Sequence, residues 1–109
     1  MIGLSPEAKL QIRKIQEAYK KDLGSKMILI VKAAQVYFDA QGSDRSEAEI
    51  QKLLHQLAGS AGMYGMEKLG DIAREGDHLL AEKKSFNETS SELKSLLGKL
   101  QQCAEQYSN

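Results

Sequence analysis

Apolar residues recur at steps of three and four along most of the chain, a pattern that predicts helices throughout. Proline occurs once, and β-branched residues cluster only between Ile28 and Val31, where no second strand-like segment could pair with them. The expected helices run from about Ser5 to Gly24, Ser25 to Ala40, Ser46 to Ala61, Met66 to Lys83 and Thr89 to Tyr107. Short connections between them predict an all-α fold, an antiparallel up-down four-helix bundle with an additional N-terminal helix.

Local signals mark the expected helix ends. Ser5-Pro6-Glu7 is typical of an N-cap followed by a first turn, and Gly24 is the expected end of the first helix. Ser46-x-x-Glu49 and Thr89-x-x-Glu92 have the spacing of capping boxes that open two later helices. The segment from Ser25 to Ala40 is apolar on most sides, so we expect it to be the most buried helix.

Length and composition limit the class of protein. A chain of 109 residues predicts one domain, residues 1–109, with one core. Fifteen lysines and arginines balance 15 aspartates and glutamates, which argues against a nucleic-acid binder. The lone Cys103 fits a reducing compartment, the start Met1-Ile2-Gly3-Leu4 lacks a signal-peptide pattern, and the longest apolar run, Met27 to Val31, is far short of the ~20 residues of a membrane span. We therefore expect a cytoplasmic protein without membrane insertion.

Few residues are suited to holding a metal ion or a nucleotide. His55, His78 and Cys103 are too few for a zinc site built from Cys and His ligands. The GxxxxGK[ST] loop that cradles phosphates is missing from the sequence. We expect this chain to bind no metal or cofactor and to have no kinase or ATPase activity of its own.

The segment from Ile50 to Tyr64 places a histidine opposite its apolar face. At ~100° per residue, the apolar residues lie within roughly 60° of one direction; they are Ile50, Leu53, Leu54, Leu57, Ala61 and Tyr64. His55 lies about 150° from that direction, so its ring is expected to project into solvent. Gly59 and Gly62 share this outer face, although each mid-helix glycine costs about 0.8–1 kcal/mol relative to alanine. Three explanations for the two glycines are open. A partner approaches His55 closely, the glycines pack against a neighbouring helix, or the helix ends near Gly59.

At these residues the sequence resembles the histidine-containing phosphotransfer (HPt) domains of bacterial and fungal phosphorelays. The motif of that family is a histidine, any residue, leucine, often lysine, glycine and a small residue, followed downstream by glycine and leucine. Here it reads His55-Gln56-Leu57-Ala58-Gly59-Ser60-Ala61-Gly62-Met63-Tyr64-Gly65-Met66-Glu67-Lys68-Leu69. The surrounding helical pattern extends the resemblance over most of the chain.

The resemblance implies a phosphorelay intermediate without autokinase activity, rather than a conventional enzyme. His55 would accept a phosphoryl group from the aspartyl phosphate of one receiver domain and pass it to the aspartate of another. The implied partners are receiver domains of response regulators, a hybrid sensor histidine kinase, or both. The resemblance also implies that Mg²⁺ is bound by the receiver, and we expect this chain to be a monomer.

The motif and the face of His55 together imply a set of residues that contact phosphate or the receiver. These residues are Gln51, Lys52, Gln56, Ala58, Gly59, Ser60 and Gly62. Many family members carry lysine three residues after the histidine, where this chain has Ala58. Lys52, at i−3 from His55, is therefore the candidate counter-charge, and Gln51, at i−4, is a candidate hydrogen-bond donor. A carboxylate near the phosphate would be unfavourable, so we assign no function to Asp77 or to the neighbouring His78.

Two other interpretations stay open at this point. A helical-bundle adaptor or inhibitor could dock on a receiver or kinase domain without being phosphorylated. Metal binding by His55 and His78 is a weaker alternative, because two histidines lack the further ligands that a metal needs. For docking on a receiver we expect an apolar centre drawn from the exposed edges of the helices around residues 25–40 and 46–61, with a polar rim.

Overall fold

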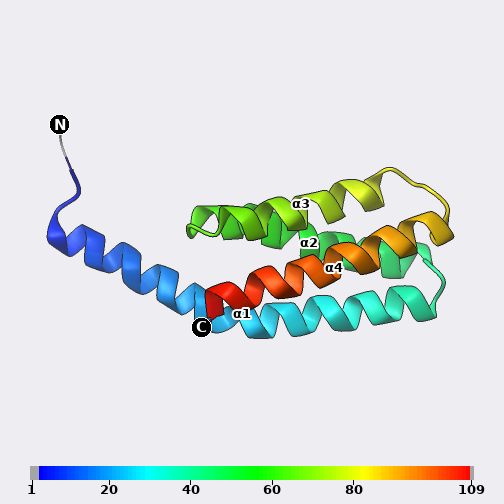
Figure 1. The fold of residues 1–109 in the computed structure, drawn as a ribbon, viewed down its shortest axis with the longest axis horizontal. Coiled ribbons are helices and arrows are strands. Elements are labelled where there is room, and N and C mark those ends of the chain that lie inside the picture. The colour runs from blue at the N-terminus through cyan, green and yellow to red at the C-terminus, as the bar shows by residue number, and fades with distance from the viewer. Residues whose placement is uncertain (1–2, 109) are drawn as a thin grey trace.

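The first helix, α1, is the longest element of the molecule (Figure 1). The computed structural model describes residues 3–108, so the expected domain limits, residues 1 and 109, lie outside the described residues. α1 spans Pro6–Asp39, 34 residues, and the longest dimension of the molecule is 51 Å. Ser5 is its N-cap, as predicted, and accepts a hydrogen bond from the backbone N–H of Ala8 at 3.1 Å.

The predicted helix end at Gly24 is wrong, because α1 continues through this residue without a break. One buried stripe crosses the glycine, with Tyr19 and Leu23 before it and Met27 after it. Packing of this stripe outweighs the roughly 1 kcal/mol that a mid-helix glycine costs. The additional N-terminal helix is therefore the first part of α1, and Figure 1 shows it projecting beyond the bundle.

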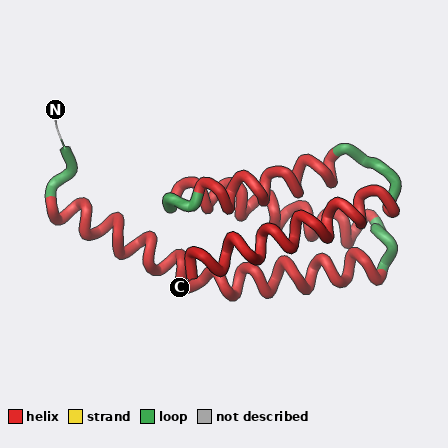
Figure 2. The backbone as a smooth tube through the Cα atoms, viewed as in Figure 1, coloured by secondary structure: helices red, strands yellow, loops and turns green. Residues whose placement is uncertain are grey.

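The remaining helices complete a four-helix bundle within the described part of the chain. They are α2 (Asp44–Met63), α3 (Glu67–Ala81) and α4 (Phe86–Ser108). α1 and α3 each pack against both α2 and α4, so the helices close into a ring. Figure 2 shows helices joined by short loops and no strand in residues 3–108. The all-α, up-down bundle is confirmed, and no helix in this range is long and apolar enough to cross a membrane.

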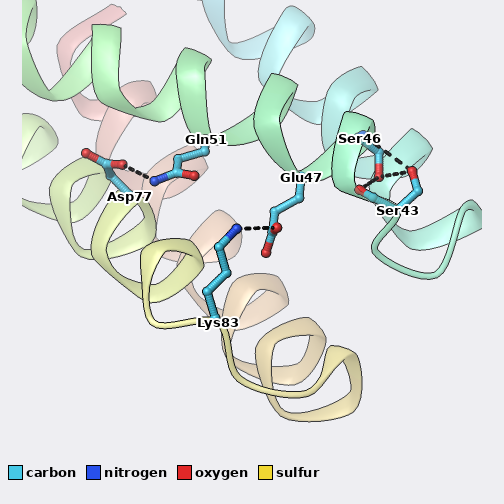
Figure 3. Close-up of polar contacts among 6 residues, drawn as sticks. All are labelled: Ser43, Ser46, Glu47, Gln51, Asp77 and Lys83. Atoms are coloured by element: carbon cyan, nitrogen blue, oxygen red, sulfur yellow. Dashed lines mark hydrogen bonds and ion pairs between the residues drawn. The ribbon is translucent and has the colours of Figure 1, made fainter.

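Both predicted capping boxes are wrong, and the two helices begin earlier. Ser43 caps α2, and its hydroxyl oxygen accepts a hydrogen bond from the backbone N–H of Ser46 (Figure 3). Ser85 precedes α4 and accepts a hydrogen bond from the backbone N–H of Glu88. The predicted caps, Ser46 and Thr89, are instead buried inside their helices. At each helix start, two residues with a hydroxyl group are able to cap the helix. The one that the core buries lies inside the helix, and the earlier one becomes the cap.

One face of each helix contributes to a shared core. Its largest fully buried side chains are Tyr37, Leu23, Ile30, Ile50, Leu54, Met66, Leu69, Leu80, Leu93 and Leu100. Cys103 is also part of this core. The expectation that residues 25–40 form the most buried helix is wrong, because α1 contacts the bundle along one side only. Ile28, Leu29 and Val36 on its other sides are more than half exposed.

Candidate functional site

His55 projects from the outer face of α2, as its position opposite the apolar stripe predicts. Ile50, Leu54 and Ala61 are almost completely buried between α2 and the rest of the bundle. The side chain of His55 is 77% exposed. The apolar stripe fixes the rotation of α2 about its axis, and this rotation points the imidazole towards solvent.

Asp77 on α3 forms a hydrogen bond with Nδ1 of the exposed His55 ring. His55 Nδ1 lies 2.8 Å from Asp77 Oδ2, and Gln51 Nε2 donates to Asp77 Oδ1 at 3.1 Å, the second contact being visible in Figure 3. The Asp77 side chain is only 15% exposed. Desolvation would raise the pKa of Asp77, but hydrogen bonds from His55 and Gln51, with the nearby imidazoles of His55 and His78, hold that pKa below its ordinary value. Asp77 is therefore a carboxylate at neutral pH.

The sequence reasoning missed Asp77, and glycines on α3 explain how it reaches His55. A Cβ at Gly70 would lie 3.2 Å from the backbone oxygen of Ala58, and one at Gly76 would lie 2.9 Å from Leu54 Cδ1. α3 therefore packs closely against α2, and Asp77 follows directly after Gly76 in the chain. Two glycines in an amphipathic helix, each followed directly by an aspartate, were the signal in the sequence for a close contact of this helix.

Gly59 and Gly62 lie on the exposed side of α2, and their surroundings exclude both alternative explanations. A Cβ at either glycine would meet no atom of another element within 4 Å, so packing against a neighbouring helix does not require glycine at either position, although the backbone of Gly62 lies close to Gly70 on α3. α2 continues to Met63, so the helix does not end near Gly59. The backbone near His55 is therefore open to close approach by another surface.

A groove between α1 and α2 lies beside the histidine. Its lining residues are Lys26, Leu29, Ile30, Leu53, Gln56, Leu57 and Ser60. A shallow depression around His55 is lined by Ala48, Gln51, Lys52, His55, Gln56 and Asp77. Because Gln56 lines both, the groove and the depression are neighbours. Four of its lining residues are apolar and three are polar, and both helices on which we expected the docking surface contribute to it.

Comparison with protein-family models matches residues 7–109 to the family described as the Hpt domain. The chain belongs to the Hpt domain family. A search of the curated proteins and a search of the solved structures found no match. Membership in the family assigns the chain to histidine phosphotransfer in two-component phosphorelays, in which Hpt domains interact with receiver domains of response regulators or with kinases.

Lys52 is the free cation nearest along α2 to the histidine of this Hpt domain. It is exposed and lines the same depression as His55. Within residues 3–108 it forms no ion pair or hydrogen bond through its ammonium group. The two lysines that follow α3 are engaged: Lys83 pairs with Glu47 at 2.8 Å (Figure 3), and Lys84 pairs with Glu82 and Glu92. The position of Lys52 is therefore compatible with the counter-charge role expected for it.

Two of the expected contact residues of this Hpt domain are directed elsewhere. Ala58 is 6% exposed and its backbone faces α3, so its side chain adds almost nothing to a docking surface. The Ser60 hydroxyl lies 2.6 Å from the phenol oxygen of Tyr19, whose ring stacks on Tyr64 with centroids 4.4 Å apart. Ser60 thus ties α2 to α1 at the edge of the groove and does not contact His55.

The metal-binding interpretation gains no support from the arrangement of ligands in this Hpt domain. Across residues 3–108, no three side chains of His, Cys, Asp or Glu are grouped so that they could hold a metal ion. His78 is exposed, and in its protonated form it helps to lower the pKa of Asp77.

Proposed function

We propose that this Hpt domain accepts a phosphoryl group on His55 from the aspartyl phosphate of one receiver and passes it to the aspartate of another. The observation that carries the proposal is the position of His55, a ring that is 77% exposed within the family motif. Asp77 engages Nδ1, so Nε2 is the nitrogen available to a phosphoryl donor.

The transfer requires one nucleophile from this chain. The Nε2 lone pair attacks phosphorus, an N–P bond forms, and the P–O bond to the receiver aspartate breaks with its electron pair left on that carboxylate. Transfer to the second receiver reverses these changes. Such chemistry asks the protein chiefly for positioning and charge compensation. Mg²⁺ and its acidic ligands belong to the receiver in this proposal, and the open backbone at Gly59 and Gly62 admits the receiver surface.

The test is a relay assembled from a phosphorylated donor receiver, this protein and an acceptor receiver. We expect label to appear first on this protein and then on the acceptor. An adaptor would bind a receiver without becoming labelled, and that result would replace the proposal by the adaptor interpretation. A receiver pair that exchanges label equally well without this protein would also contradict it.

Lys52→Ala is expected to slow phosphoryl acceptance by about two- to fivefold. An exposed ion pair contributes up to about 1 kcal/mol, and about 1.4 kcal/mol corresponds to a tenfold change. Stopped labelling reactions with a phosphorylated receiver measure the rate, and decay of the labelled protein measures the phosphohistidine lifetime. Lys99→Ala on α4 is the control and should change neither. The assignment of Lys52 is wrong if its substitution also leaves both quantities unchanged.

Leu29→Glu is expected to weaken receiver binding by roughly tenfold, because it places a charge in the apolar centre of the groove beside His55. Ile28→Glu provides a matched control. The two side chains are 55% and 56% exposed, but Ile28 points about 100° away around α1. Titration calorimetry with a receiver should separate the two variants. Equal losses, or none, would show that the receiver does not use this groove.

A further inference from the structure

The first part of α1, residues 6–18, projects beyond the bundle (Figure 1), and we call it the extension. The buried stripe of α1 continues into it. From buried Tyr19 the stripe runs towards the N-terminus through Ile15, Ile12 and Ala8, at steps of four, three and four. At ~100° per residue, these four side chains lie within roughly 60° of each other. The extension therefore presents an apolar stripe on the same side of α1 as the core.

Nothing within residues 3–108 covers the stripe on the extension. Ile12 and Ile15 are 42% and 52% exposed, and neither belongs to the core or packs against it. A depression lies where the extension meets α2, and its lining includes Ile15, Tyr19 and Tyr64. An amphipathic helix gains most of its stability by packing its apolar face. We therefore expect a partner to cover this stripe.

We propose that the stripe binds an amphipathic helix of a partner protein, one that carries acidic side chains along one edge of its own apolar face. Lys9 and Arg13 lie one helical turn apart, about 90° and 130° from the centre of the stripe. Their charged groups form no ion pair or hydrogen bond within residues 3–108. Two unpaired cations beside an apolar stripe are complementary to acids on the facing edge of a partner helix.

A second copy of this chain fits the stripe less well. In an antiparallel pair of helices the same edge of each helix meets, so Lys9 and Arg13 would face the same two cations of the other copy. In a parallel pair both bundles would lie at the same end of the paired extensions. They would also lie on the side where the stripes meet, because the stripe faces the same side as the core, and the two bundles would collide.

A flat surface such as a membrane also fits the stripe less well. α2 and α4 pack against α1 on the side that the stripe faces, so the end of the bundle stands beside the stripe. A membrane surface would meet the end of the bundle before it covered Ile15. A helix, which is about 10 Å across, can lie along the stripe as far as this end.

The test uses the full chain and a synthetic helical peptide as long as the extension. The peptide is stapled, with leucines on one face and glutamates along one edge of that face, and a second peptide has lysine in place of each glutamate. Fluorescence anisotropy at low ionic strength measures the two dissociation constants. We expect the glutamate peptide to bind at least about tenfold more tightly than the lysine peptide. Lys9→Ala/Arg13→Ala should reduce this difference to less than about threefold.

Ile15→Glu tests the stripe, and Leu10→Glu is the matched control. The two side chains are 52% and 50% exposed, but Leu10 points about 140° away from Ile15 around the helix. Ile15→Glu should weaken binding of the glutamate peptide at least about tenfold, and Leu10→Glu less than about threefold. The proposal goes beyond phosphoryl transfer, because it needs no phosphate. His55→Gln should therefore bind the peptide as the parent does, whether or not His55 carries a phosphoryl group.

Three results with the peptides would overturn the proposal: no binding of either peptide, equal affinity for both, or equal losses in the two glutamate variants. Dimerisation of the parent in sedimentation, removed by Ile15→Glu and kept in Leu10→Glu, would assign the stripe to a second copy instead. Binding of the parent to vesicles of phosphatidylglycerol and phosphatidylcholine, with the same response to the two variants, would assign it to a membrane surface.

Discussion

His55→Gln is expected to abolish phosphoryl transfer between two receivers, reducing it to the background measured without this protein. Glutamine has no nucleophilic nitrogen, because its amide lone pair is delocalised into the carbonyl group. The substituted side chain is exposed, so folding should be unaffected and the thermal midpoint should stay within about 2 °C of the parent. The relay of two receivers, with label followed on each protein, measures the loss.

His78→Gln is the matched control for that substitution. It removes the other histidine, which lies beside Asp77 in the chain and is exposed. We expect at least half of the parental transfer rate in this variant. If transfer persists in His55→Gln and disappears in His78→Gln, the phosphoryl carrier is His78, and the assignment of His55 is wrong.

Leu54→Ala is expected to lower the free energy of unfolding by about 2–5 kcal/mol, the range for removing a fully buried leucine. Leu54 is 2% exposed, and its Cδ1 lies close to Gly76 on α3. In a domain of this size each kcal/mol shifts the thermal midpoint by several degrees, so a decrease of at least ~10 °C is expected. Urea titration and thermal melting followed by circular dichroism measure both quantities.

Leu29→Ala is the control for the core substitution, because Leu29 is 55% exposed. Its effect should stay within about 0.5 kcal/mol, as for most surface substitutions. The Leu54→Ala protein should also lose part of the His55–Asp77 contact, since Leu54 packs against the residue that precedes Asp77. A Leu54→Ala protein as stable as the Leu29→Ala protein would contradict the packing described between α2 and α3.

The direction in which His55 points could be predicted from the sequence, because it depends only on the period of one helix. The apolar stripe of α2 fixes the angle of His55, and the structure confirms the exposure of its ring. The neighbouring Asp77 could not be placed in this way. Its contact depends on how far α3 slides along α2, which is set by close packing at Gly70 and Gly76 rather than by any period within one helix.

The helix ends were predicted less well, because local signals compete with packing over longer distances. Gly24 has the local character of a helix end, but a buried stripe that continues on both sides of it keeps α1 intact. Ser46 and Thr89 have good capping spacing, yet burial places them inside their helices and leaves the caps to Ser43 and Ser85. The positions of these helix ends depend on packing between helices, which the sequence of a single segment does not specify.

Direct phosphorylation of the isolated protein tests the central claim. The protein is treated with phosphoramidate, its intact mass is measured, and the modified residue is located in a peptide map kept at alkaline pH. We predict one added phosphate, on His55, in a linkage that is labile to acid and stable to alkali. An unmodified protein under conditions that phosphorylate a second, known histidine carrier, or a phosphate on any residue other than His55, would contradict the account.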